Sequence, residues 1–346
     1  MKSIVINGKF MSQTVTGVQR YAREILLELD ALIQSDIQII LAVNSDTRDI
    51  PEYKNIQVKT IGRFTGNLWE QISLPLFVKK NKALCVSLCN MTPILTSGIV
   101  VIHDISYKVN PDFYSRMFSL WYRFVFALSI KRIKQIITDT EFSRKEITKY
   151  YNIPSDKMKL IYCGWQHFSR IPFSENSLKK YDLTKGNYYF AMSSMAPNKN
   201  FKWIAEAARN NPDDIFAVSG SVNNKVFGDI FDFEVPENLK FLGYVSDEEA
   251  KTLMRDCKAF LFPTFYEGFG IPPLEAMSVG AKAIVSDASC MREVFEDSVY
   301  YVDPNNYDID LDVLISGNVS DPQKILDKFS WRESAEKLYE IIRGNI

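Results

Sequence analysis

The stretch that most constrains the fold lies in the C-terminal half, where two apolar runs enclose a glycine-rich turn and a short helix. Residues 258–262 form an apolar run that ends at Pro263, which is typical of a buried parallel strand. Pro272 and Pro273 fit the first turn of a helix, where a missing N–H costs nothing, and Gly280 fits its end. A strand, a helix and a second apolar run in this order predict a parallel α/β sheet.

The turn between that strand and helix has the features of an anion-binding site. It comprises Glu267, Gly268, Phe269, Gly270 and Ile271. The glycines allow a ligand to approach the backbone closely. Free N–H groups at the start of a helix attract an anion, and the helix dipole adds about half a charge.

Two carboxylates flank this turn, Glu267 within it and Glu275 in the first helical turn. A carboxylate repels phosphate but accepts hydrogen bonds well from vicinal hydroxyls. A ligand with a central diphosphate and a sugar at each end would satisfy both carboxylates and the amides. The alternative is that Glu275 only complements the helix dipole and Glu267 is a solvated loop residue.

Bulk properties indicate an ordinary globular protein. The 346 residues, 46% of them hydrophobic, are enough for two domains. No run of eighteen apolar residues is present, and the N-terminal apolar run is too short for a signal peptide. The five cysteines show no metal-ligand spacing, so we expect reduced thiols in a cytosolic protein.

The net charge of −1 hides an asymmetry between the halves of the chain. Residues 1–168 hold 22 Lys+Arg and 14 Asp+Glu, and the remainder holds 19 and 28. A basic first half suits an anionic acceptor or an anionic membrane surface. Alternatively, the two halves simply attract each other.

The first half alternates strands and helices. Gly17 opens a helix predicted over 18–32, and His103 follows an apolar strand over 98–102. Ligands bind at the carboxyl ends of strands in doubly wound sheets, which favours a functional His103 over a structural one. A long helix is predicted over 112–134. Its aromatic and basic residues fit either a core helix or an interfacial membrane contact.

The second half begins after a polar segment, 165–186, that we interpret as the interdomain linker. Lys199 stands just before a predicted helix, where a cation opposes the dipole unless an anion binds there. This position favours Lys199 as a phosphate ligand. Arg20 and Arg292 are both candidates for a second cation. His167, in the linker, is interpreted as structural.

The segment from Glu267 to Met277, with its two glutamates eight residues apart, resembles the signature of retaining glycosyltransferases of family 4. The resemblance implies the GT-B fold, with two Rossmann-like domains facing a cleft. These would be an acceptor-side domain over 1–168, with 330–346 as a helix crossing back onto it, and a nucleotide-sugar domain over 169–329. The chain departs from the family at Asn198, where an Arg is usual.

The resemblance also implies roles for individual residues. Glu267, His103 and Lys199 would be catalytic: Glu267 and His103 on the donor sugar, Lys199 on the diphosphate. Because no carboxylate nucleophile is apparent opposite His103, a front-face mechanism is expected, in which the leaving phosphate takes the acceptor proton. No metal is expected. The donor would contact Gly17, Ser194, Lys199, Gly220, Tyr244, Glu267, Gly268, Phe269, Gly270, Ile271 and Glu275.

The predicted reaction moves a sugar from a UDP-, GDP- or dTDP-sugar to an acceptor hydroxyl, with no separate cofactor. By analogy, the acceptor is a lipid-linked glycan in the synthesis of a surface polysaccharide such as O-antigen or capsule. The enzyme would be cytoplasmic, with peripheral contact at the inner membrane and no nucleic-acid partner. The alternative is a GT-B protein that binds a sugar nucleotide, or an epimerase, without transferase activity.

Overall fold

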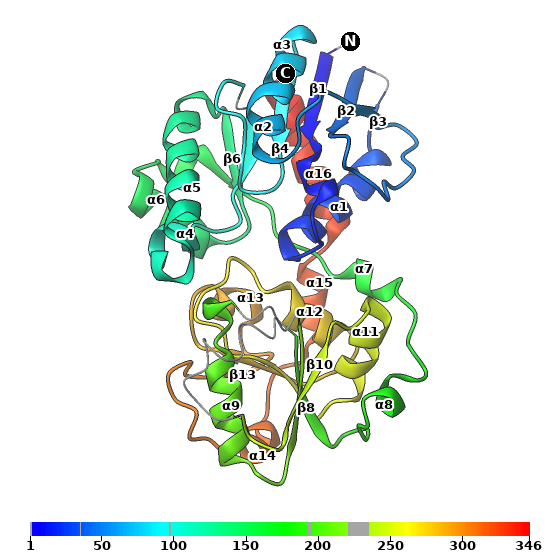
Figure 1. The fold of residues 1–346 in the computed structure, drawn as a ribbon, viewed down its shortest axis with the longest axis vertical. Helices are drawn as coiled ribbons and strands as arrows, with labels where there is room; N and C mark the ends of the chain where they lie inside the picture. The colour runs from blue at the N-terminus through cyan, green and yellow to red at the C-terminus, as the bar shows by residue number, and fades with distance from the viewer. Residues whose placement is uncertain (1, 35, 97, 193–195, 221–234) are drawn as a thin grey trace. The chain divides into compact units, whose positions relative to one another are not determined.

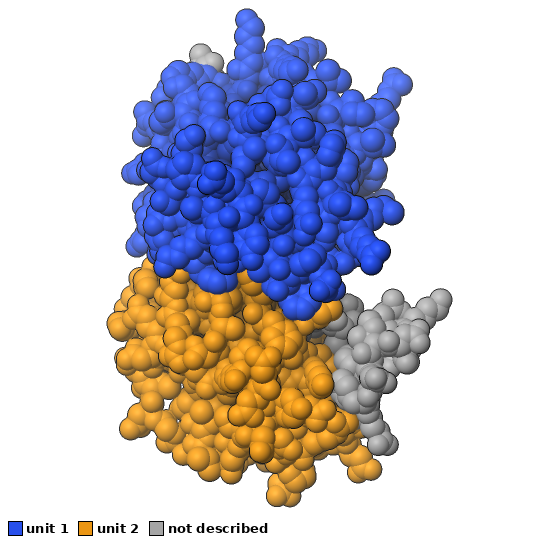
Figure 2. All heavy atoms as spheres, turned by 90° about the vertical axis from the view of Figure 1, so that its left-hand side faces the viewer, with its two compact units in different colours: residues 1–164, 330–346 blue, residues 165–329 orange. Residues whose placement is uncertain are grey.

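The computed structural model describes residues 2–34, 36–96, 98–192, 196–220 and 235–346. They form two compact units (Figures 1 and 2). Unit 1 comprises residues 1–164 and 330–346, and unit 2 comprises residues 165–329. Each unit is built on a parallel sheet, as predicted for two Rossmann-like domains.

Unit 1 contains a seven-stranded sheet in the order β3-β2-β1-β4-β5-β6-β7, in which every pair is parallel. Buried apolar residues fill the middle of its central strands, as expected where helices cover both faces. Successive strands are added in one direction from β1 and in the opposite direction from β4. The topological switch point, where ligands bind in such sheets, therefore lies at the carboxyl ends of β1 and β4. The strands are β1 (Lys2–Asn7), β2 (Ile37–Val43), β3 (Gln57–Thr60), β4 (Leu84–Ser87), β5 (Ile99–Val101), β6 (Gln135–Thr138) and β7 (Met158–Leu160).

One helix of unit 1 comes from the C-terminal end of the chain, which returns to this unit after unit 2. Within the described residues the helices of unit 1 are η1 (Gly8–Ser12), α1 (Gly17–Asp30), α2 (Gly66–Leu68), the π-helix η2 (Trp69–Ser73), α3 (Leu74–Lys80), α4 (Ser106–Val109), η3 (Pro111–Phe113), α5 (Arg116–Ser129), η4 (Ile130–Arg132), α6 (Glu141–Tyr151), η5 (Ser155–Lys157) and α16 (Trp331–Gly344). Helix α16 packs against α1 (Figure 1), and buried Trp331 meets the Tyr21 ring edge-on. The predicted crossing helix is confirmed.

Unit 2 contains a six-stranded parallel sheet in the order β10-β9-β8-β11-β12-β13. The described strands are β8 (Tyr188–Met192), β9 (Ile215–Ser219), β10 (Leu239–Gly243), β11 (Ala259–Phe262), β12 (Ala283–Ser286) and β13 (Tyr300–Val302). The described helices are α7 (Gln166–Ser169), α8 (Ser177–Lys180), η6 (Pro197–Lys199), α9 (Phe201–Asn210), α11 (Asp247–Asp256), α12 (Ile271–Ser278), α13 (Met291–Phe295), α14 (Leu311–Ser316) and α15 (Gln323–Lys328). The strand–turn–helix–strand predicted from the sequence is β11–α12–β12.

The helix predicted over 112–134 is wrong in its length. The chain forms η3, α5 and η4 there, and α5 begins only after Ser115, whose hydroxyl accepts a hydrogen bond from the amide of Phe118. A local cap of this kind starts a new helix and separates it from the turn before it.

The segment 165–186, interpreted from the sequence as a linker, is part of unit 2. Trp165 Nε1 donates to the Leu326 carbonyl at 2.9 Å, and Gln166 Nε2 donates to the Phe329 carbonyl at 2.9 Å. These bonds join the segment to α15 and the residue after it. The unit boundary therefore lies at 164/165, and the predicted boundary at 168 lies inside α7.

Candidate active site

The turn between β11 and α12 takes a backbone path that requires glycine at its end. Gly270 is the N-cap of α12 with φ of 100°. A Cβ there would lie 3.0 Å from Met291 Cε and 3.3 Å from a Phe295 ring carbon. A side chain would therefore be strained by both its backbone conformation and its contacts.

Two amides at this turn remain available for a ligand. Within the part of the chain that the structure describes, the N–H groups of Gly270 and Ile271 donate no hydrogen bond. Pro272 and Pro273 follow them in the first turn and have no N–H. The donors of this helix start are thereby concentrated at Gly270 and Ile271, beside the positive end of the dipole.

Glu267 and Lys199 form an ion pair beside the turn. Lys199 Nζ lies 2.6 Å from Glu267 Oε1, and the two side chains are 22% and 14% exposed. Lys199 ends η6, which follows β8, and its ammonium lies over the Phe262 ring at 5.4 Å. The amide of Glu267 donates to Ser289 Oγ at 3.2 Å, which anchors the turn. A cation and a hydroxyl acceptor therefore lie side by side, as a phosphate next to a sugar requires.

Glu275 has a partner that the sequence did not indicate. Its Oε1 lies 2.7 Å from Nε2 of His167, and both side chains are buried. His167 comes from α7, which is remote in sequence from α12. The His167 ring orients the Glu275 carboxylate. If Glu275 accepts hydrogen bonds from ribose hydroxyls, His167 is therefore its positioning residue.

The two candidates for a second cation differ in their surroundings. The Arg292 guanidinium holds both oxygens of Asp287, at 2.5 and 2.6 Å, and lies over the Tyr301 ring. This hydrogen bond and charge lower the pKa of Asp287. Arg292 is committed to a surface pair within unit 2, whereas Arg20 belongs to α1 of unit 1. Asn198, at the position where the family usually has Arg, donates to the Tyr266 carbonyl at 3.4 Å.

The remaining predicted donor contacts in unit 2 lie on loops. The Gly220 amide donates to the Gly243 carbonyl at 2.9 Å, joining the ends of β9 and β10, and Tyr244 beside them is 82% exposed. Ser194 lies outside the described residues. The roles of these residues stay predictions.

In unit 1, Gly17 begins α1 at the carboxyl end of β1. It is exposed, and Thr16 before it caps the helix through a reciprocal bond with Gln19. Gly17 is not among the described glycines with positive φ. A close approach of the donor at Gly17 stays a prediction.

His103 is held by its neighbours at both ring nitrogens. Nδ1 lies 2.6 Å from Asp139 Oδ2, and Nε2 donates to the Leu88 carbonyl at 2.9 Å. Burial lowers the pKa of His103, but the charge and hydrogen bond of Asp139, with the Leu88 carbonyl, raise it overall. With both ring nitrogens engaged, the imidazole has no free nitrogen to act as a general base. A catalytic role for His103 stays a prediction, which the geometry narrows to charge stabilisation or positioning.

Comparison with known proteins relates the chain to glycosyltransferases. Residues 173–316, which include the turn with Glu267 and Lys199, match the family described as "Glycosyl transferases group 1". The chain is 27% identical to the O-antigen chain mannosyltransferase RfbU of Salmonella typhimurium, over 88% of this chain and 87% of that protein. It is 30% identical to the O-antigen chain mannosyltransferase B of Escherichia coli, over 70% of this chain but less than two thirds, 64%, of that protein.

The chain contains a group 1 glycosyltransferase domain. Its fold is that of GT-B glycosyltransferases: WaaG, a glycosyltransferase involved in lipopolysaccharide biosynthesis, matches with a TM-score of 0.72 at 15% identity, covering 99% of this chain and all of WaaG. Sucrose-phosphate synthase from Thermosynechococcus elongatus matches with a TM-score of 0.75 at 14% identity, covering 99% of both chains. The protein is a glycosyltransferase, an enzyme that takes a nucleotide-sugar donor and a glycan acceptor.

Among the described residues, no cluster of three or more His, Cys, Asp or Glu side chains is arranged to hold a metal ion. None of the described helices combines the length and the hydropathy needed to cross a bilayer.

Proposed function

We propose that this glycosyltransferase transfers mannose, with retention of anomeric configuration, from a nucleoside diphosphate mannose to a lipid-linked glycan in O-antigen or capsule synthesis. Two relatives named as O-antigen chain mannosyltransferases support the sugar and the class of product. The motif from Glu267 to Met277 supports membership of retaining family 4.

The observation that carries the proposal is the Lys199–Glu267 pair beside the free amides of Gly270 and Ile271. The difficult step is to stabilise charge on the departing diphosphate. Lys199 and the two amides supply positive charge and donors for it. Glu267 accepts from hydroxyls of the donor sugar, and Glu275, oriented by His167, accepts from the ribose.

The acceptor proton has a simple route in this scheme. The imidazole of His103 is already engaged at both nitrogens, so the leaving phosphate oxygen takes the proton from the acceptor hydroxyl. The C–O bond to phosphate breaks as the C–O bond to the acceptor forms on the same face of the sugar. The neighbouring Lys199 and amides stabilise the phosphate until that proton arrives. No metal enters this scheme.

We further propose that unit 1 contacts an anionic membrane through α5. Exposed apolar residues recur along one stripe of this helix: Met117 (82% exposed), Leu120 (64%), Phe124 (55%) and Leu128 (42%). Arg116, Lys131, Arg132 and Lys134 are exposed at its two ends. An apolar stripe flanked by cations fits a surface of anionic lipid, where a lipid-linked acceptor resides.

A nucleotide screen combined with Glu267→Ala tests the transferase assignment. We expect one of UDP, GDP or dTDP to raise the thermal unfolding midpoint of the wild type by mass action. Glu267→Ala should keep or strengthen this effect, because Lys199 loses its carboxylate partner, while transfer from the matching mannose nucleotide falls by roughly 10²-fold or more. The exposed Glu52→Gln serves as control.

The result separates the proposal from the alternative of a non-catalytic sugar-nucleotide protein. Nucleotide binding without transfer in the wild type would support that alternative. Unchanged transfer by Glu267→Ala would show that the role assigned to this residue is wrong. Trapping of a glycosyl-enzyme adduct would contradict the front-face step.

A further inference from the structure

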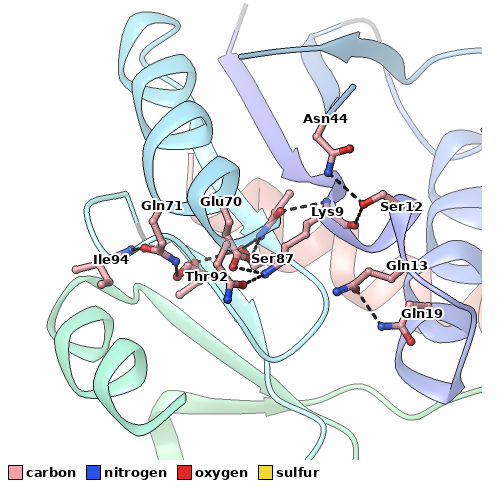
Figure 3. Close-up of polar contacts among 12 residues, drawn as sticks. Lys9, Ser12, Gln13, Gln19, Asn44, Glu70, Gln71, Ser87, Thr92 and Ile94 are labelled. Atoms are coloured by element: carbon pink, nitrogen blue, oxygen red, sulfur yellow. Dashed lines mark hydrogen bonds and ion pairs between the residues drawn. The ribbon is translucent and has the colours of Figure 1, made fainter. Parts of the chain in front are cut away.

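Unit 1 contains a buried charged network that the proposed mechanism does not use (Figure 3). Glu70 is 1% exposed, and its Oε2 accepts from Lys9 Nζ at 2.8 Å while its Oε1 accepts from Asn7 Nδ2 at 2.8 Å. Lys9 Nζ also donates to Asn67 Oδ1 at 2.6 Å, and Asn7 donates to Ser87 Oγ at 3.3 Å. The network joins the carboxyl ends of β1 and β4, the switch point of the sheet.

Fold stability alone is a poor explanation for this network. A buried ion pair usually gains little over apolar packing, because both charges must be desolvated. Glu70 also lies in η2, a π-helix, and π-turns inserted between α-helices occur frequently at functional sites. The inserted turn lets Trp69 pack in the core, where its Nε1 donates to the Ile61 carbonyl, while the next residue, Glu70, joins the polar network.

The network lines a cavity of about 140 Å³ that lies entirely within unit 1. This volume is close to that of engineered cavities of about 150 Å³ that bind benzene. It therefore suits one six-membered ring and is too small for a nucleoside diphosphate. Besides Lys9 and Glu70, its lining includes four side-chain amides, from Asn7, Gln13, Gln19 and Asn90, and the aromatic ring of Tyr122.

The chemistry of the lining matches a polyhydroxylated and uncharged ring. Lys9 and Glu70 together contribute no net charge, and the other lining side chains are neutral. The Lys9 ammonium has three N–H donors, of which Glu70 and Asn67 take two, and a carboxylate offers about four acceptor positions. Vicinal hydroxyls can accept from the remaining N–H and donate to the carboxylate. An anionic ring would meet the Glu70 carboxylate without an unpaired cation to offset the repulsion.

We infer that this cavity binds one uncharged sugar ring of the acceptor, and that Lys9 and Glu70 determine its specificity by hydrogen bonding to two of its hydroxyls. The identification of the ring as the acceptor rests on the proposed function. Asn90 connects this cavity to His103, a predicted catalytic residue of the same unit, because Asn90 Oδ1 accepts from the backbone amide of His103 at 2.7 Å.

Ligand-observed NMR on the full-length protein tests this inference without requiring turnover. The probes are methyl α-D-mannopyranoside, a neutral hexoside, and methyl β-D-glucuronide, which carries a carboxylate. We expect saturation transfer to the neutral hexoside and at least tenfold weaker binding of the glucuronide. Glu70→Gln should weaken binding of the neutral hexoside at least tenfold, and Glu52→Gln, an exposed carboxylate of the same unit, should not.

A second variant guards against a folding defect. Glu70→Gln leaves Lys9 buried without its anion, whereas Glu70→Gln with Lys9→Met leaves no unpaired charge. Both variants should keep wild-type thermal stabilisation by nucleotide, which reports on the predicted donor site in unit 2. Three results would each overturn the inference. They are hexoside binding by the double variant at the wild-type level, equal binding of both probes, and the absence of hexoside binding by the wild type. Failure of the proposed function would appear separately, as the absence of nucleotide binding and transfer.

Discussion

At the scale of single residues, the His103–Asp139 pair is a buried, hydrogen-bonded part of the candidate site. The raised pKa of His103 means that the folded protein holds this proton more tightly than the unfolded chain, whose histidine pKa is about 6.5. The contribution to stability is complete below pH of about 6.5 and is lost as pH rises through the folded pKa. The charged ring therefore stabilises unit 1 on the acid side of this window.

Asp139→Asn should remove most of this contribution. Burial then dominates and lowers the pKa of His103, so the variant should be destabilised by about 3–5 kcal/mol at pH 6, a typical cost for breaking a buried pair. The difference in stability between the variant and the wild type should shrink as the pH rises above the pKa of His103 in the folded protein. Thermal unfolding midpoints of the variant and the wild type from pH 5.5 to 9 measure this difference in stability. Asp156→Asn, at an exposed position, is the control. A gap that stays constant across this range would contradict a charged His103.

Residue types were more predictable from the sequence than residue partners. Glu267, Glu275 and Lys199 stand in local motifs, because glycines, prolines and helix starts have short-range signatures. The partner of Glu275 is His167, 108 positions away, and only the tertiary fold brings them together. Glu70 and Lys9 were missed for the same reason. The one sequence signal for Glu70 was its position as a carboxylate beside a tryptophan in a mostly apolar segment, Leu68 to Leu76.

At the scale of elements, α5 combines two faces with different uses. Its inner face, with buried Val125 and Phe126, packs on the sheet. Its outer face carries the exposed apolar stripe. A second stripe, Leu68, Ile72 and Leu76, is exposed on the segment from α2 to α3. The two segments are neighbours, since Glu70 and Tyr122 line the same cavity, so the stripes belong to adjacent helices.

Charge reversal at the end of α5 tests the membrane contact. Lys131→Glu with Arg132→Glu should weaken binding to phosphatidylglycerol vesicles by at least about 30-fold, because each basic residue contributes about 1 kcal/mol at an anionic surface. Vesicle co-sedimentation measures the loss. The matched control is Lys54→Glu with Lys59→Glu, two exposed lysines at and before the edge strand β3. Unchanged binding, or self-association of the wild type in place of vesicle binding, would reject the contact.

The type and order of most elements were predictable, because most strands are short apolar runs and several helices have side-chain caps. Ser246, for example, caps α11 and forms a capping box with Glu249. One error falls at the local cap Ser115, which divides the helix predicted over 112–134, and another falls where a polar segment folds against a neighbour. Segment 165–186 has no hydrophobic periodicity of its own, yet bonds of Trp165 and Gln166 attach it to unit 2.

At the scale of the whole molecule, the two units carry opposite charge. Unit 1 has 25 Lys+Arg against 17 Asp+Glu, and unit 2 has 16 against 25. Unit 2 nevertheless contains the predicted diphosphate site. Its net field repels a nucleotide, so binding depends on short-range donors, namely Lys199 and the amides of Gly270 and Ile271. The positive field of unit 1, in contrast, attracts an anionic surface over a distance.

These two kinds of binding should respond to salt in opposite ways. Raising the salt from about 0.05 M to 0.3 M shortens the Debye length to well below 10 Å, which screens long-range fields but hardly affects partly buried contacts. Vesicle binding should therefore weaken steeply, whereas the affinity for the matching nucleotide, measured by calorimetry, should stay constant or rise slightly as the repulsion from unit 2 is screened. Lys199→Met should lose nucleotide affinity at every salt concentration, and Lys240→Met, an exposed lysine of the same unit, should not. A tenfold fall in nucleotide affinity over this range would mean that a long-range positive field, rather than the turn before α12, holds the diphosphate.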